Sequence, residues 1–89
     1  MVHHIVTKSG FEIDMNTEAL DDMEVFELIV EVDKGDATKL PALLGLILAP
    51  EQKTALYEHC RTENGRVPIS AVVAEFAQIM EGMRDAEKK

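Results

Sequence analysis

The sequence is poor in the residue types that cross-link or stiffen small proteins. It contains one cysteine, Cys60, no tryptophan, three phenylalanines and one tyrosine. A single cysteine cannot form an internal disulfide, which excludes the disulfide-rich scaffolds of small secreted proteins and is typical of a reducing cytoplasm. With so few rings, the core must be built from aliphatic side chains and from the five methionines, which adapt to irregular packing.

Basic residues are also scarce. Nine Lys and Arg stand against seventeen Asp and Glu, which gives a formal net charge of −8. Binding to nucleic acid or to an anionic membrane surface depends on basic side chains, so we expect neither partner. The acidic residues are concentrated between Glu12 and Asp36, a segment that contains ten carboxylates and only one basic residue, Lys34. This stretch is either a solvated face that keeps the protein soluble or a surface that meets a basic partner.

Long apolar runs are missing too. The longest, from Leu40 to Leu48, contains Pro41 and Gly45 and is far shorter than the roughly 20 residues that a membrane-spanning helix needs. No basic segment followed by an apolar core begins the chain, so we expect no signal peptide. The 89 residues fit a single domain, 1–89.

The pattern of apolar residues predicts a small α+β domain that is mainly α. Residues 2–15 read as a β-hairpin around Ser9-Gly10, and alternation places Phe11, Ile13 and Met15 on one face of its second strand. About four helices are expected over residues 18–86. We expect the first from Glu18 or Asp22 to Asp33, the second after Asp36, the third from Pro50 to a stop at Asn64-Gly65, and the fourth from Pro68 or Ile69 to Asp85.

Two of these predicted helices carry more apolar surface than an ordinary amphipathic helix. The first is apolar except for a stripe of glutamates. Because Val, Ile and Phe also favour strands, the residues from Phe26 to Val32 could form either a helix or a strand. The last has a long apolar seam at three- and four-residue steps, with its surplus expected toward Ile79, Met80 and Met83. We therefore predict self-association or partner binding through these helices. The predicted partner-binding residues are Phe76, Ile79, Met80, Met83, Phe26 and Ile29.

Reactive residue types do not form a catalytic or metal-binding pattern. His3 and His4 are neighbours and point to opposite faces of a strand, which is poor geometry for a metal. His59 and Cys60 are neighbours on a predicted helix, where side chains diverge, so Cys60 is expected to be a small buried hydrophobic residue rather than a nucleophile. We expect no catalytic residue, no metal and no cofactor, and an interaction protein rather than an enzyme.

The order of short motifs along the chain is more specific than any one of them. The motifs are Phe11–Asp14, Leu20–Leu28, Gly35-Asp36, Leu40–Leu44, Glu51-Gln52-Lys53 followed by Leu56, and Gly65–Pro68. In this order, over roughly residues 11–83, the chain resembles the tail assembly chaperones of long-tailed phages and prophages of Gram-positive bacteria.

The resemblance implies a small, mostly helical protein that does no covalent chemistry. Such proteins coat the long, helical tape measure protein in the cytoplasm of the bacterial host and keep it soluble while tail protein polymerises around it. The family has no catalytic positions to transfer to this sequence. An apolar helix face that holds amphipathic helices, and a strongly acidic composition that keeps the complex soluble, both fit that role.

Two other functions remain open from the residues themselves. One is a generic acidic protein-interaction module, such as an antitoxin or a regulatory subunit. The other is a DNA mimic that inhibits a nucleic-acid enzyme, which would need carboxylates at phosphate-like spacing across one face. The carboxylates between Glu12 and Asp36 instead intermingle with an apolar helix, which weakens the second alternative.

Overall fold

The computed structural model describes residues 2–87 as a β-hairpin followed by four helices. The predicted fold class, mainly helical with an N-terminal antiparallel hairpin, is confirmed. Two short 3-10 turns, η1 and η2, join the main elements. The elements are β1 (Val2–Val6), β2 (Glu12–Asn16), η1 (Thr17–Leu20), α1 (Met23–Asp33), η2 (Ala37–Lys39), α2 (Leu40–Ile47), α3 (Pro50–Cys60) and α4 (Ile69–Glu87).

The hairpin buries one face, as the alternation predicts. Its strands are antiparallel, with Ile5 opposite Ile13 and His3 opposite Met15. Both isoleucines and Met15 are buried, whereas the residues between them on β2 are exposed. The turn is closed by a hydrogen bond from the Thr7 amide to the Phe11 carbonyl at 2.9 Å, and it contains a glycine at a φ of 92°. Only glycine adopts such an angle readily, which explains its place in the turn.

The segment whose conformation the sequence left open is a helix. Asp22 caps α1, because its Oδ1 accepts hydrogen bonds from the amides of Glu24 at 2.9 Å and Val25 at 3.4 Å. The helix ends at Asp33, and Gly35 follows with a φ of 100°. Val25 and Ile29, one turn apart, form the buried side of the helix.

The predicted end of the third helix was wrong. The α3 helix stops at Cys60, because Arg61 is already extended with a ψ of 134°. The Asn64-Gly65 pair lies in the following loop, where the Gly65 amide donates to the Thr62 carbonyl at 3.0 Å and the Thr62 amide donates to the Arg66 carbonyl at 2.7 Å. The pair therefore makes a tight turn within the loop instead of a helix stop.

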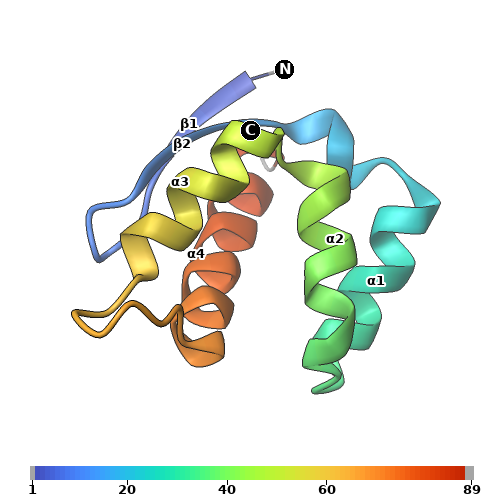
Figure 1. The fold of residues 1–89 in the computed structure, drawn as a ribbon. Coiled ribbons are helices and arrows are strands. Elements are labelled where there is room, and N and C mark those ends of the chain that lie inside the picture. Colours follow the sequence, from blue (N-terminus) through green and yellow to red (C-terminus); the bar gives the residue numbers. More distant parts are fainter. Residues whose placement is uncertain (1, 88–89) are drawn as a thin grey trace.

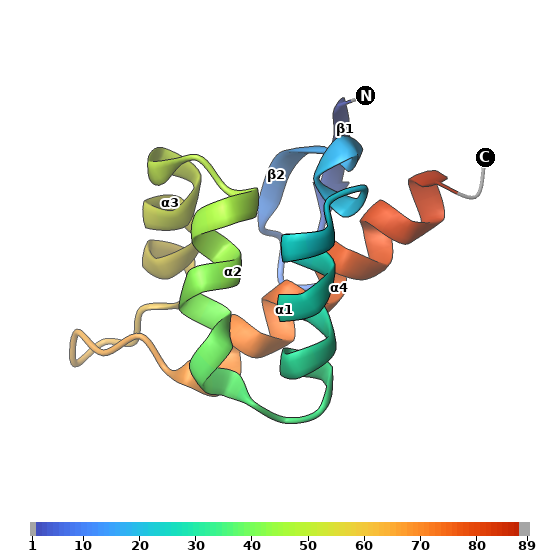
Figure 2. The ribbon, with the colours of Figure 1, turned by 90° about the vertical axis from the view of Figure 1, so that its right-hand side faces the viewer.

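The second helix also starts later than its predicted cap. Asp36 accepts from the Thr38 amide at 3.2 Å and so caps η2, while α2 proper begins at Leu40 with Pro41 in its first turn. Figure 1 shows α4 between the hairpin with α3 on one side and the pair α1 and α2 on the other. The quarter-turned view shows α1 and α2 side by side, with α4 behind them (Figure 2).

A close approach fixes α4 against the hairpin. Gly82 faces Ile5 of β1 so closely that a Cβ added to this glycine would lie 2.9 Å from the Ile5 Cγ2 atom. The core around this contact is aliphatic, as the composition requires. Its largest fully buried side chains are Met15, Leu43, Leu44, Leu56, Ile79 and Met83.

Candidate functional site

The structure places five of the six predicted partner-binding residues inside the domain. Phe76, Ile79, Met80, Met83 and Ile29 are all buried in the common core. The α4 helix packs against β1, α3 and η1, and Met83 is fully buried, so the surplus expected near Met83 is not on the surface. Phe26, the sixth residue, is 53% exposed on α1. A partner role for the six residues and self-association both stay predictions.

An apolar groove opens between α2, α3 and the start of α4, and we call it the α2–α3–α4 groove. It has a volume of about 420 Å³. Its lining residues are Ala37, Thr38, Leu40, Pro41, Leu44, Tyr57, Val67, Ile69 and Val72. A space of this size, lined mostly by aliphatic side chains, suits an apolar ligand or the anchor side chains of a partner helix.

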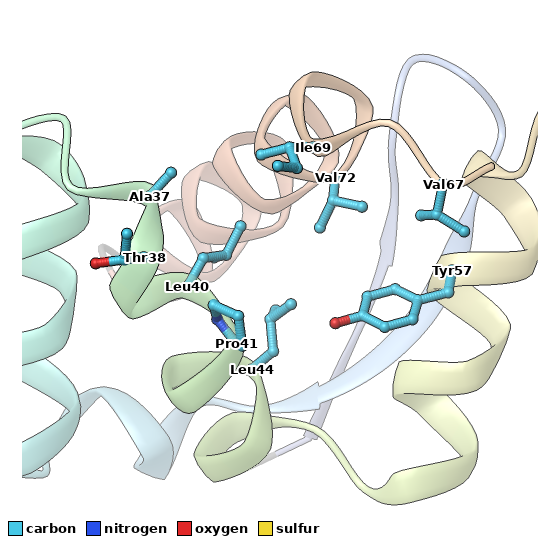
Figure 3. Close-up of a pocket in the computed structure, with 9 residues that line it drawn as sticks. All are labelled: Ala37, Thr38, Leu40, Pro41, Leu44, Tyr57, Val67, Ile69 and Val72. Atoms are coloured by element: carbon cyan, nitrogen blue, oxygen red, sulfur yellow. The ribbon is translucent and has the colours of Figure 1, made fainter.

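Figure 3 shows how side chains from three helices surround this groove. The Tyr57 ring reaches from α3 toward Leu44 of α2, and Val72 of α4 lies on a third side. Ile69 stands at the rim and is 70% exposed. The Lys53 ammonium lies 5.8 Å from the centre of the Tyr57 ring, which brings one positive charge close to this wall. The groove can thus hold apolar groups, and it presents no acid–base pair.

A second apolar surface follows the outer side of α1, and we call it the α1 face. Met23, Phe26, Leu28 and Val30 line a shallow depression of about 640 Å³ together with three charged residues, Glu27, Glu31 and Lys39. The α1 helix lies at an outer edge of the molecule in Figure 1. Exposed apolar side chains are therefore found on α1, and at Ile69 in the first turn of α4, but not at Ile79, Met80 or Met83.

A buried carboxylate, which the sequence analysis missed, ties three elements together. Glu75 of α4 is only 6% exposed. Its Oε1 accepts from the Thr7 hydroxyl at 2.7 Å, and its Oε2 accepts from the Ser9 hydroxyl at 2.9 Å. His59 of α3 completes the network, with its Nε2 2.8 Å from the Ser9 Oγ. The feature of the sequence that could have revealed this network is the position of Glu75, an acidic residue within the apolar seam of α4 between Val72 and Ile79.

The order of groups in this network does not suit nucleophilic catalysis. In a serine triad the imidazole stands between the hydroxyl and the carboxylate, so that it can remove the hydroxyl proton. Here the Ser9 hydroxyl stands between His59 and Glu75 and directs its proton to the carboxylate. With the Ser9 proton on the Glu75 side, the tautomer of His59 that carries a proton on Nε2 donates to Ser9, and His59 is not placed as the base of Ser9. The network links the hairpin turn, α3 and α4 by hydrogen bonds.

The pKa values of Cys60 and His4 are shifted. Burial raises the pKa of the half-buried Cys60 thiol, and the charge of Glu75 adds to this effect. A raised pKa keeps the thiol protonated and unreactive at neutral pH. On the outer face of the hairpin, hydrogen bonds to Asp14 and then to Glu12 raise the pKa of His4 above its usual 6.5.

Among the side chains that the structure describes, no group of three or more His, Cys, Asp or Glu is arranged to hold a metal ion. Within residues 2–87, no helix combines the length and the apolar character needed to cross a membrane. Comparison with protein-family models, with curated proteins and with solved structures found no match.

Proposed function

We propose that this protein is a non-enzymatic tail assembly chaperone of a phage or prophage, which binds the tape measure protein in the bacterial cytoplasm and keeps it soluble. The observation that carries the proposal is the α2–α3–α4 groove, a preformed apolar channel between helices. The resemblance in motif order names the partner. A groove of this kind takes the apolar face of an amphipathic helix, and tape measure proteins are rich in helices.

The mode of binding follows from the groove walls. Aliphatic side chains from Leu40, Leu44 and Val72 would surround an inserted Leu or Ile of the partner, while Ile69 at the rim would cover it from the side. Burial of apolar area supplies the binding free energy, at about 25 cal/mol for each Å² removed from water. The net charge of −8 would keep the complex dispersed.

Co-expression with a tape measure fragment tests this proposal. The fragment is taken from the gene neighbourhood of this protein, and the soluble fraction is measured with and without the chaperone. We expect the wild-type chain to keep the fragment soluble and to co-purify with it. The Ile69→Asp variant should lose this activity, because it places a charge at the groove rim.

A matched control is available on α2. Leu46 is 54% exposed and does not line the groove, so Leu46→Asp makes the same chemical change away from the site. Equal loss in both variants, or a fragment that stays insoluble with the wild-type chain, would contradict the proposal. A neighbouring toxin gene in place of a tape measure gene would favour the antitoxin alternative.

A further inference from the structure

The outer row of the α1 face is exposed without an intramolecular reason. Met23 and Phe26 are 68% and 53% exposed, and the half-buried Val30 continues the row one turn later. The steps of three and four residues place these side chains on one side of the helix. The adjacent side, with Val25 and Ile29, already supplies the contacts to the core. A large ring held in water on a chain with only three phenylalanines marks an interaction surface.

An acidic row runs alongside this apolar row. Glu24, Glu27 and Glu31 are again spaced by three and four residues, and each lies one position after or before a member of the apolar row. The segment from Asp21 to Asp36 contains seven carboxylates and one basic residue, Lys34. Lys39 also lines the depression. The apolar row thus has a row of negative charge along one side.

We propose that the α1 face docks a basic amphipathic helix, whose apolar seam covers Met23, Phe26 and Val30 and whose Lys or Arg side chains meet the glutamate row. Charge decides between occupants. A second copy of this chain would bring its own acidic row and its share of the −8 net charge to the same contact, and like charges at an interface are unfavourable. A partner with positive flanks gains attraction where a second copy meets repulsion.

This inference concerns a different surface from the one used in the proposed function. The α1 face and the α2–α3–α4 groove share no lining residue. Either can be disabled by substituting a residue that is more than half exposed, Phe26 for the α1 face and Ile69 for the groove. Failure of one proposal therefore leaves the other standing.

Two designed peptides serve as probes, measured by fluorescence anisotropy with the full chain. Each is a helix of about five turns, or 18 residues, with a leucine seam at three- and four-residue steps. One carries lysines beside the seam and the other glutamates. We expect the lysine peptide to bind at least about tenfold more tightly, and its affinity to fall as salt is raised.

Three single-residue variants locate the binding, and one double variant tests the role of charge. Phe26→Ser should weaken the lysine peptide by about tenfold or more, because an aromatic anchor carries a large share of such an interface. Leu46→Ser and Ile69→Ser, which change apolar residues elsewhere that are at least as exposed, should bind like the wild type. Replacing Glu27 and Glu31 together by lysine should reverse the preference between the two peptides. Circular dichroism melting checks the fold of each variant, and Met23→Ser replaces Phe26→Ser if the latter is unstable.

Several results would overturn the inference. Unchanged binding by folded Phe26→Ser would mean that the peptide is held by charge alone. Equal affinity for the two peptides would remove the role of the glutamate row. Loss of binding in Ile69→Ser alone would place the peptide in the α2–α3–α4 groove. Conversion of a wild-type dimer into a monomer by Phe26→Ser, seen by sedimentation, would make the α1 face a contact between copies.

Discussion

His4 lies between two carboxylates on the solvent side of the hairpin. Its Nδ1 is 2.7 Å from Asp14 Oδ1, and its Nε2 is 3.0 Å from Glu12 Oε1. Both partners favour the protonated ring, so the pKa of His4 is raised from 6.5. The stabilisation from this pairing is present below pH 6.5 and is lost as the pH rises through the raised pKa.

The His4 shift can be measured by following its imidazole protons by NMR as a function of pH. We expect a midpoint above 6.5 in the wild-type chain. Asp14→Asn should lower the midpoint toward 6.5, because hydrogen bonding to Asp14 is the largest cause of the raised pKa. Glu12→Gln should lower it less. A midpoint that does not move in Asp14→Asn would show that the pair does not form in solution.

At the level of elements, the contact between α4 and β1 depends on the missing side chain of Gly82. Alanine is normally favoured over glycine in a helix by about 1 kcal/mol. At residue 82 a methyl group would meet Ile5 atoms at 2.9 and 3.2 Å, so the helix or the strand would have to move. We expect Gly82→Ala to lower the free energy of unfolding by about 1 kcal/mol despite its better helix propensity.

Gly45 provides the matched control for this change. It is an exposed glycine within α2, and a Cβ there would meet no atom within 4 Å. Gly45→Ala should therefore raise the free energy of unfolding by up to about 1 kcal/mol. Urea denaturation of the two variants measures the difference. If both alanines stabilise the protein equally, the close packing of α4 against β1 is not present.

The Glu75 network joins elements that are far apart in sequence. Glu75→Gln replaces an acceptor of two hydroxyl protons by an amide, which leaves a buried polar group poorly satisfied and costs about 1–3 kcal/mol of unfolding free energy. Glu81→Gln makes the same change at an exposed position of α4 and should have little effect. Thermal or urea unfolding compares them. Equal stability of the two variants would mean that the network contributes nothing.

Sequence patterns predicted the elements better than they predicted the surfaces. Alternation identified the buried face of β2, because that signal is local. The start of α1 was left open between Glu18 and Asp22, and the structure places the cap at Asp22. Periodicity showed that α1 and α4 are apolar, but it could not show which neighbour covers which face. Met83 is fully buried in the core, and nothing in the described part of the chain covers Phe26 to the same extent. The Glu75 network could not be predicted from local patterns, because the partners of Glu75, Thr7 and Ser9, lie more than sixty residues away in the sequence.

For the molecule as a whole, the charge of −8 sets the response to salt. Repulsion among like charges opposes the compact state, and dissolved ions screen it. We expect the melting temperature at neutral pH to rise by a few degrees between low salt and about 0.5 M NaCl. This corresponds to a gain on the order of 1 kcal/mol in the free energy of unfolding.

The double variant Glu27→Lys with Glu31→Lys tests the cause of this salt response. Each replacement adds two positive units, so the formal net charge changes from −8 to −4. The rise in melting temperature with salt should become smaller in this variant. A rise of the same size would show that the response does not come from net charge.

The contacts between the hairpin turn and α4 also bear on how the protein folds during its synthesis. The Thr7 hydroxyl and the Lys8 amide bond to Glu75 and Gln78, which are 68 and 70 residues further along the chain. A two-stranded hairpin is only marginally stable by itself. The apolar face of the hairpin therefore emerges from the ribosome long before the helix that covers it has been made. Folding must be completed late in translation, and until then the nascent chain exposes the face that Ile5 and Ile13 later bury.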